Sequence, residues 1–218
     1  EVVCGPGWFV EGEEGACQPC PASTYREEDG GVLGSEGGAH PCTPCGNGSL
    51  SAEGSRNASA CVACPAGTYV SEDGQLKLQC APCGLGKASA AVGATSPSTC
   101  AACPAGTFGN GLGLAACVAC PVGTYSSAVG AQTPDTCLAC PGASRTTLAR
   151  GSTSSAACVC ASGTLLDPDG ADAAAAANGL VGACVGCPPG LNCTAKGTTR
   201  ASVELERGFW RASARSLL

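Results

Sequence analysis

The stretch Cys64-Pro65-Ala66-Gly67-Thr68-Tyr69 decides the fold of this chain, because close copies of it recur along the sequence. The clearest copies begin at Cys20, Cys103 and Cys120. The Pro-x-Gly segment predicts a turn, and Thr followed by an aromatic residue favours a short extended segment. A loop rich in Ser, Gly and Ala then leads to the next cysteine. Each copy is therefore expected to form a small, irregular hairpin.

Paired cysteines set the period of these copies. The sequence contains eight C-x-x-C pairs and one tighter pair, Cys158-Val159-Cys160, and their first cysteines follow one another at steps of 17 to 26 residues. A period sustained over most of a chain is typical of repeat arrays, in which each unit contacts mainly its neighbours. The expected fold is small and disulfide-rich: an elongated array of short, irregular β-hairpin modules with little helix.

The composition replaces an apolar core with cysteine. The chain has 33 strong core-forming residues in 218, made up of 16 Leu, 14 Val and 3 Phe, with no Ile or Met. That stock is too small for a conventional globular enzyme domain of this length. The 20 cysteines instead indicate a disulfide scaffold, which needs an oxidising compartment. We therefore expect an extracellular or cell-surface location.

Charge and hydropathy restrict the partners. The chain has 11 Lys and Arg against 17 Asp and Glu, a net charge of −6, and no stretch rich in Lys or Arg. Such a chain matches the phosphate backbone of nucleic acid poorly, so we expect no nucleic-acid partner. No apolar run reaches the roughly 18 residues that span a bilayer. The sequence is interpreted as part of a longer secreted or membrane-anchored protein that meets a membrane only through segments outside this chain.

Cysteine parity restricts the disulfide pairing. Outside the nine close pairs stand only Cys4 and Cys193. If each close pair closed on itself, its ring would be too small to restrain the fold. Splitting every pair uses all the cysteines in a sequential ladder, which we favour. Its bridges are Cys4–Cys17, Cys20–Cys42, Cys45–Cys61, Cys64–Cys80, Cys83–Cys100, Cys103–Cys117, Cys120–Cys137, Cys140–Cys158, Cys160–Cys184 and Cys187–Cys193.

Other uses of the cysteines stay open at this point. Crossed pairing within groups of four, such as Cys45–Cys64 with Cys61–Cys80, also uses every cysteine, and spacing does not decide between the two schemes. Two successive C-x-x-C pairs also satisfy the spacing of a zinc ribbon. Because His40 is the single histidine and the series of pairs is unbroken, we expect no metal and no cofactor.

The repeats that begin at Cys64, Cys103 and Cys120 resemble the ephrin type-A/B receptor-like cysteine-rich domain, which is related in style to tumour-necrosis-factor-receptor modules. The resemblance covers roughly residues 4–160 and, more loosely, residues 184–193. It implies an extracellular module of a kind that recurs as a spacer in large ectodomains.

The end of the chain carries a second resemblance. The segment from Cys187 to Cys193, followed by Gly208-Phe209-Trp210-Arg211, resembles the module that closes repeat arrays in large algal and protist surface proteins. This resemblance implies that the chain belongs to a large surface protein of such a source.

The pattern divides the chain into three parts. Residues 1–160 carry the tandem cysteine-rich repeats. Residues 161–193 form a divergent insert with the last disulfide module, and residues 194–218 form an extended segment leading to a further domain.

Local signals predict the structure of the last two parts. In the insert, Asp172 is placed to cap a short helix over residues 173–177. In the last part, Val203, Leu205 and Phe209 alternate as in a strand.

Three N-glycosylation sequons suit a secreted protein, in which they would carry N-linked glycans. They are Asn47-Gly48-Ser49, Asn57-Ala58-Ser59 and Asn192-Cys193-Thr194. Asn47 and Asn57 are expected to share one loop, where glycans would shield one face. Asn192 is less favoured, because a bridged Cys193 occupies the middle position of its sequon.

The aromatic residues fall into two sets. The recurrent rings are expected to cover neighbouring disulfides as the small core of each repeat, and they are Tyr25, Tyr69, Phe108 and Tyr125. A repeat array needs caps or partners at its ends. The candidates for such contacts are Trp8, Phe9, Phe209 and Trp210.

The acidic residues offer only loose calcium-binding patterns. Two clusters are interpreted as solvated surface, and they are Glu11, Glu13 and Glu14, and Glu27, Glu28 and Asp29. Residues 167–172 loosely resemble an EF-hand loop, but their glycine comes two positions early and the closing Glu is absent. A turn is expected at residues 167–170 instead.

No set of residues suggests catalysis. One His, no unpaired cysteine on the parity count and no Ser/His/Asp or paired-carboxylate arrangement leave no general base, so we expect no enzyme. The expected function is that of a non-catalytic structural spacer or assembly segment of a large extracellular cell-surface or flagellar-surface glycoprotein. Its expected partners are other extracellular chains or further copies of itself. The alternative is the ligand-binding ectodomain of a membrane receptor.

Overall fold

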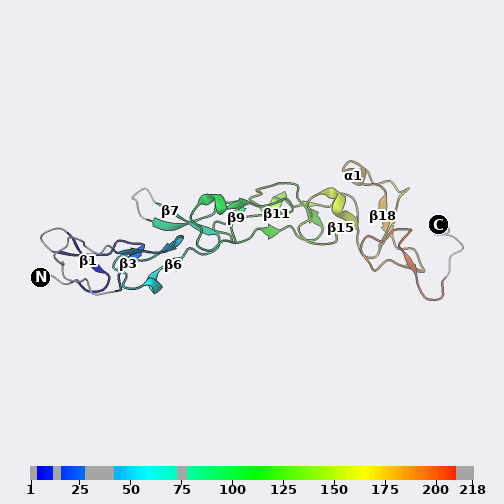
Figure 1. Cartoon of the computed structure of the whole chain (residues 1–218). Coiled ribbons are helices and arrows are strands. Elements are labelled where there is room, and N and C mark those ends of the chain that lie inside the picture. Colours follow the sequence, from blue (N-terminus) through cyan, green and yellow to red (C-terminus); the bar gives the residue numbers. More distant parts are fainter. Residues whose placement is uncertain (1–3, 12–15, 28–41, 73–77, 210–218) are drawn as a thin grey trace. The chain divides into compact units, whose positions relative to one another are not determined.

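The computed structural model describes residues 4–11, 16–27, 42–72 and 78–209. Over these residues the regular structure consists of twenty short strands, four single turns of 3-10 helix and one α-helix (Figure 1). The expectation of a small disulfide-rich fold, built from short β-hairpins with little helix, is confirmed.

The chain divides into two compact units. The first comprises residues 1–101 with 111–116, and the second comprises residues 102–110 with 117–218. Residues 111–116 lie in the loop of the repeat that starts at Cys103, so this loop packs with the preceding repeats while the rest of its repeat belongs to the second unit.

The strands lie in consecutive pairs, each odd-numbered strand with the one that follows it, as separate two-stranded sheets. The first ten strands are β1 (Trp8–Glu11), β2 (Ala16–Pro19), β3 (Thr24–Tyr25), β4 (Thr43–Pro44), β5 (Ser49–Leu50), β6 (Val62–Ala63), β7 (Thr68–Glu72), β8 (Leu78–Pro82), β9 (Lys87–Ala88) and β10 (Ala101–Ala102). The other ten are β11 (Thr107–Phe108), β12 (Val118–Ala119), β13 (Thr124–Tyr125), β14 (Leu138–Ala139), β15 (Arg145–Thr147), β16 (Cys158–Cys160), β17 (Thr164–Asp167), β18 (Ala183–Gly186), β19 (Leu191–Asn192) and β20 (Glu204–Leu205).

Short helical turns lead into the second cysteine of four repeats. They are η1 (Ala58–Ala60), η2 (Pro97–Thr99), η3 (Pro134–Thr136) and η4 (Ser155–Ala157). Each ends directly before a cysteine that opens a close pair. Each 3-10 turn therefore connects the irregular loop to the cysteine and strand that follow it.

The motif turn explains why each hairpin starts where it does. In the copy at Cys64, the backbone N–H and the hydroxyl of Thr68 both donate to the carbonyl oxygen of Pro65, at 3.1 and 2.7 Å. Gly67, between them, has a φ of +86°, which glycine adopts without strain. Thr therefore closes the turn as well as starting the strand. The equivalent hydroxyl bonds are made by Thr24, Thr107 and Thr124.

Ten disulfides join the twenty cysteines in the order of the sequential ladder, and none is left free. Crossed pairing is not adopted, since Cys45 is bonded to Cys61 rather than to Cys64. Sequence separations within the bridges run from 6 to 24 residues. An isolated two-stranded hairpin is marginally stable in water, so these covalent loops supply stability that a core supplies elsewhere.

Cysteine also dominates the buried interior. Among the described residues, the largest fully buried side chains are seven cysteines with Thr147 and Ser126. A cluster with aliphatic residues occurs in the last module, where Leu165, Leu191 and Val203 pack with Cys193. The interior is therefore divided among the repeats instead of forming one shared core.

The insert contains the one α-helix of the described residues, α1 (Ala173–Ala176). Asp172 caps it, because its Oδ1 accepts a hydrogen bond from Ala175 N at 3.0 Å. The chain leaves the helix at Gly179, whose φ is +76°. The expected cap and short helix are confirmed, and so is the preceding turn, in which Gly170 N donates to Asp167 O at 3.2 Å.

The chain after Cys193 folds back onto the last module, which differs from the extended segment expected from residue 194. Gly197 N donates to Cys160 O at 2.8 Å, and β20 pairs with β19. The strand ends at Leu205, and Phe209 does not continue it, because Gly208 has a left-handed φ of +92° that turns the chain. The proposed part boundaries at residues 160 and 193 stay predictions.

Candidate functional site

The most regular feature of the molecule is a backbone contact that links three successive repeats. In the first unit, Cys83 N donates to Gly67 O and Gly113 N donates to Cys83 O, each at 2.8 Å. A Cβ on Gly67 would overlap the carbonyl oxygen of Gly113, so these two glycine backbones are in direct contact. We call this set the glycine–cysteine–glycine contact.

The glycine–cysteine–glycine contact recurs in the described chain. The same two hydrogen bonds and the same glycine overlap occur three more times, always within one unit. The further sets are Gly7, Cys20 and Gly54; Gly48, Cys64 and Gly93; and Gly106, Cys120 and Gly151. Each set joins the turn of one repeat, the cysteine of the next and the loop of the one after that. Backbone groups, which are independent of side-chain identity, therefore hold the repeats together.

The loop glycines of this contact were not singled out in the sequence, although they carry a signal. Gly54, Gly93 and Gly151 each lie seven residues before the cysteine that opens the next pair. All three have positive φ, between +69° and +77°. In a sequence with 33 glycines, this spacing stands out only once the partner glycines are known.

One recurrent aromatic ring covers a disulfide as expected. Phe108 is 7% exposed and packs with Cys120 and Ala131, and Cys137 contacts the same cluster. The ring thus lies on the Cys120–Cys137 bridge of the following repeat. The other three rings, which are those of Tyr25, Tyr69 and Tyr125, are half-buried, and their role as covers stays a prediction.

The first two sequons lie within the loop closed by the Cys45–Cys61 bridge, on either side of the two-residue strand β5. Asn47 lies in the turn before β5, whereas Asn57 lies after β5 and precedes η1. The strand separates them because the motif turn begins only two residues after Cys45. Both side chains are exposed, and the Asn57 Oδ1 accepts from the hydroxyl of Ser59 at 2.6 Å.

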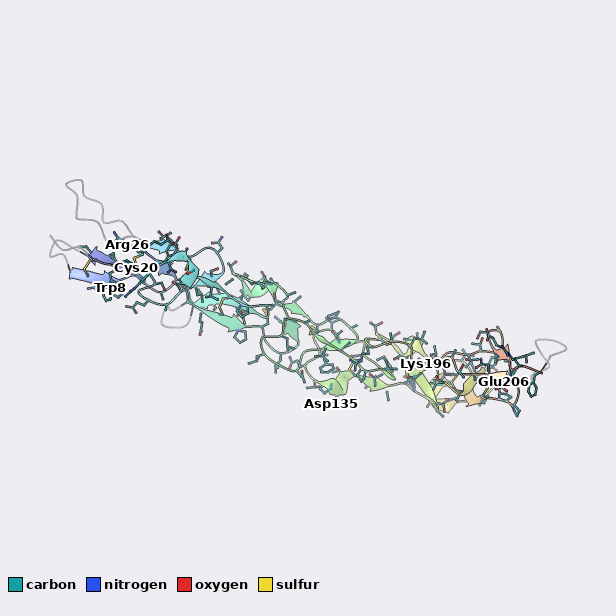
Figure 2. All side chains as sticks on the ribbon, turned by 90° about the horizontal axis from the view of Figure 1, so that it is seen from below. Trp8, Cys20, Arg26, Asp135, Lys196 and Glu206 are labelled. Atoms are coloured by element: carbon teal, nitrogen blue, oxygen red, sulfur yellow. A yellow bond between two sulfur atoms is a disulfide. The ribbon has the colours of Figure 1, made fainter. Side chains whose placement is uncertain are left out.

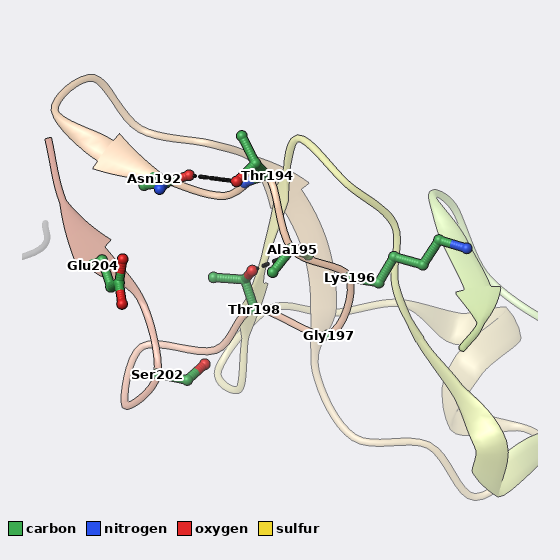
Figure 3. Close-up of a pocket in the computed structure, with 8 residues that line it drawn as sticks. All are labelled: Asn192, Thr194, Ala195, Lys196, Gly197, Thr198, Ser202 and Glu204. Carbon is green, nitrogen blue, oxygen red and sulfur yellow. Dashed lines mark hydrogen bonds between the residues drawn. The ribbon is translucent and has the colours of Figure 1, made fainter. Parts of the chain in front are cut away.

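The third sequon lies on β19. The Asn192 side chain is half-buried, and its Oδ1 accepts hydrogen bonds from the backbone N–H and the hydroxyl of Thr194, at 3.1 and 2.7 Å. Asn192 and Thr194 line two cavities, and Figure 3 shows the one that also includes residues 195–198, Ser202 and Glu204. Occupancy of all three sequons stays a prediction.

The terminal aromatic residues differ in their exposure. Trp8 lies on β1 (Figure 2). It is 39% exposed, and Phe9 is half-buried. Phe209 is 55% exposed, yet one face of its ring covers Gly190, where a Cβ would overlap it. Trp210 lies outside the described residues. The structure therefore leaves part of Trp8 and Phe209 available, and their role in contacts stays a prediction.

The acidic residues of the insert have defined partners. Arg200 pairs with Asp167 at 2.7 Å and with Asp169 at 3.4 Å, and Asp172 caps α1. Among the residues that the structure describes, no group of three or more His, Cys, Asp or Glu is arranged to hold a metal ion. Most residues of the two N-terminal acidic clusters, and the single histidine, lie outside the described residues; they are Glu13, Glu14, Glu28, Asp29 and His40.

Arg145 is a contact residue that the sequence did not indicate. Its Nη2 donates to the carbonyl oxygens of Val181 and Gly182, at 3.2 and 2.8 Å. Asp172 adds a second link, because its Oδ2 accepts from Ala143 N at 3.2 Å. These bonds hold the insert against the preceding repeat, more than 25 residues earlier in the chain. Contacts between residues so far apart in the sequence cannot be predicted from a local sequence pattern.

Comparison with known families agrees with this architecture. The family model described as tyrosine-protein kinase ephrin type A/B receptor-like matches three overlapping stretches, residues 53–100, 95–137 and 106–158. Each stretch contains whole hairpins with their disulfides. No curated protein matches the chain. None of the helices in the described part is both long and apolar enough to cross a bilayer.

Proposed function

Residues 53–158 are ephrin type-A/B receptor-like cysteine-rich repeats, and we propose that the chain is a non-catalytic structural spacer or assembly segment of a large extracellular glycoprotein. Ten disulfides and this family of repeats suit an extracellular domain. The parent protein would belong to a cell-surface or flagellar-surface structure, with other extracellular chains or copies of itself as partners.

The glycine–cysteine–glycine contact is the observation that carries this proposal. A spacer has to hold its two neighbours at a defined separation, so each repeat must resist bending relative to the next. Hydrogen bonds from Cys83 to Gly67 and from Gly113 to Cys83 tie three consecutive repeats through their backbones. Direct contact between the Gly67 and Gly113 backbones leaves no side chain that could move aside.

The placement of the disulfides supports the same role. Each bridge closes a loop within its own repeat, as Cys64–Cys80 and Cys83–Cys100 do. A pulling force on such a repeat can extend only the short segments between bridges, because the chain inside each loop is held covalently. Bridges give each repeat its strength, and backbone contacts transmit the load between repeats.

A deletion of two whole repeats tests the spacer function. Removing residues 64–102 from the full-length parent protein joins Ala63 directly to Cys103 and restores a C-x-x-C pair. It removes two complete bridges, Cys64–Cys80 and Cys83–Cys100, so every remaining cysteine keeps its partner. A spacer predicts that the parent assembly still forms, with the distance between the flanking domains shortened by two repeats in electron micrographs.

The result also discriminates against the receptor alternative. A ligand-binding ectodomain predicts loss of a soluble ligand on deletion, while the surface structure keeps its dimensions. A matched control deletes one repeat of the same kind, residues 103–119. It should shorten the distance between the flanking domains by less than the deletion of two repeats does. An assembly in which both deletions leave the distance between the flanking domains unchanged would contradict the spacer proposal.

A further inference from the structure

The last module presents a polar cavity directly beside the third sequon. Asn192 on β19 pairs with Glu204 on β20, so the two side chains share one face of this small hairpin. The cavity between them and the following loop has a volume of about 430 Å³, within the roughly 300–1,000 Å³ of small-molecule sites. Its lining consists mainly of hydrogen-bonding residues, and they are Asn192, Thr194, Ala195, Lys196, Gly197, Thr198, Ser202 and Glu204 (Figure 3).

The amide of Asn192 is oriented by its own sequon. Both hydrogen bonds from Thr194 go to the Asn192 Oδ1, at 3.1 and 2.7 Å, and Figure 3 shows this oxygen turned toward Thr194. These bonds fix which amide atom faces Thr194. Within the described structure Nδ2 makes no hydrogen bond, so this nitrogen is the free atom of the side chain at the cavity.

The neighbouring disulfide does not block this nitrogen. Successive residues of a strand point to opposite faces, so Asn192 lies on the face of β19 opposite the buried Leu191. Cys193 is 3% exposed and packs with Leu165 and Val203, away from solvent. The bridged cysteine in the middle of the sequon is therefore buried with the core of this module, whereas Asn192 lines the cavity.

We propose that Asn192 carries an N-linked glycan whose first sugar, an N-acetylhexosamine, lies in this cavity. In the modification, Nδ2 of Asn192 attacks the anomeric carbon of a lipid-linked oligosaccharide diphosphate. The new bond joins that carbon to Nδ2, the bond from carbon to phosphate oxygen breaks, the lipid diphosphate leaves, and Nδ2 loses one proton. This inference rests on the proposed extracellular location, since the reaction belongs to the secretory route.

The cavity offers partners to the polar groups of such a sugar. Glu204 has an exposed carboxylate with no hydrogen bond in the described structure, and it accepts from sugar hydroxyl or acetamide donors. The Thr198 hydroxyl donates to Ala195 O at 2.7 Å and keeps its lone pairs for a sugar hydroxyl. Lys196 contributes mainly backbone, because Figure 3 shows its side chain directed away from Asn192.

The exposed sequon at Asn57 provides an internal reference. Its side chain lies on the surface, and its Oδ1 is likewise bonded by the hydroxyl of its sequon, from Ser59 at 2.6 Å. Glycans on Asn57 and Asn192 would thus share the local sequon geometry and differ in the presence of a cavity. Slower enzymatic release of the glycan at Asn192 than at Asn57 would therefore indicate that the cavity holds the sugar.

The test uses protein secreted by eukaryotic cells and has two steps. Glycopeptide mass spectrometry measures occupancy at each sequon, and Asn192 is expected to be occupied. An amidase that cleaves the Asn–sugar bond then measures how fast each glycan is released from native protein. The glycan on Asn192 is expected to be released about tenfold more slowly than the glycan on Asn57, which corresponds to a free-energy difference of about 1.4 kcal/mol. After reduction and denaturation the two release rates are expected to be equal.

Two variants separate a sugar held by the cavity from one that is merely crowded. Glu204→Ala should raise the release rate at Asn192 toward that at Asn57 and leave Asn57 unchanged. Thr194→Ser keeps the sequon and its hydroxyl and should behave as the parent. Equal native rates at the two sites, or slow release that Glu204→Ala does not change, would overturn the cavity as a sugar site.

The outcome also distinguishes this inference from its premise. Occupied Asn47 and Asn57 with unmodified Asn192 would overturn the inference and leave the extracellular location standing. Protein from its native source with no glycan at any of the three sequons would overturn the inference and remove this support for a secretory route.

Discussion

At the scale of single residues, two glycines from neighbouring repeats show how position decides the role of a residue. Gly67 has a φ of +86°, and a Cβ on it would overlap the backbone of Gly113. Gly84 has no positive φ and nothing within 4 Å of its would-be Cβ. The first is required by a contact between repeats, and the second is tolerant of a side chain.

Replacing Gly67 should therefore weaken the glycine–cysteine–glycine contact. We expect Gly67→Ala to cost about 2–4 kcal/mol, because it adds left-handed strain and backbone overlap. The measurement is native-state hydrogen exchange, in which the amides of Cys83 and Gly113 should exchange about 30-fold faster or more. Gly84→Ala is the matched control and should leave these rates within about twofold. Unchanged exchange at both amides in Gly67→Ala would show that the contact carries no free energy.

The recurrent aromatic position offers a second test of this kind. Phe108 is 7% exposed and packs on the Cys120–Cys137 bridge, whereas Leu138, on β14, is 55% exposed. Phe108→Ala should lower the free energy of unfolding by about 2–4 kcal/mol, because it opens a void beside the sulfurs. Leu138→Ala should change it by less than about 0.5 kcal/mol. Chemical denaturation with the bridges intact compares the two, and equal effects would contradict a core role for the ring.

At the scale of elements, the insert is held by polar contacts to backbone. Arg145 on β15 donates to Val181 O and Gly182 O, and Asp172 both caps α1 and accepts from Ala143 N. A helix of four residues has little stability of its own, so these contacts are what order it.

Removing the Arg145 contact should release the insert without unfolding the repeats. In Arg145→Ala we expect a protease that cuts before Asp to cleave within residues 167–172 at least about tenfold faster, since cleavage follows local opening. Arg150→Ala removes an exposed arginine of the same repeat and serves as the control. Cleavage that is equally fast in the two variants would argue that Arg145 does not hold the insert.

The disulfide ladder is tested at the same scale. Peptide mapping without reduction should recover Cys64 joined to Cys80 and Cys103 joined to Cys117, and thiol titration should find essentially no free cysteine. The reason is that the folded hairpins bring the Cα atoms of these pairs to 5.5 and 5.7 Å, within the range of a disulfide. A peptide joining Cys61 to Cys80 would establish crossed pairing, and zinc with many titratable thiols would overturn the disulfide scaffold.

At the scale of the whole molecule, local bridges and a small apolar stock predict an extended particle. The 33 large aliphatic and Phe residues cannot form one shared core, and each repeat contacts mainly its neighbours. The radius of gyration should clearly exceed the roughly 17 Å of a compact domain of this length. Small-angle scattering measures it, and a value near that of a compact sphere would contradict the array in solution.

Sequence by itself determined the local features of this protein. Pro-x-Gly-Thr indicated the motif turn, Asp172 before a run of Ala indicated a capped helix, and an even number of cysteines in close pairs restricted the bridges to a sequential or a crossed scheme. Each of these depends on residues within about 25 positions of one another, so spacing and local preference are sufficient to predict it.

Only the tertiary structure decided the features that join distant segments. The contact of Gly67 with Gly113 needs three folded repeats, and the contact of Arg145 with Gly182 joins the insert to the repeat before it. The outward orientation of Asn192 depends on β19 pairing with a strand that follows a long loop. Which backbone groups meet across repeats and which strands pair depend on the folded chain, so the sequence shows the sequon at Asn192 but not the cavity beside it.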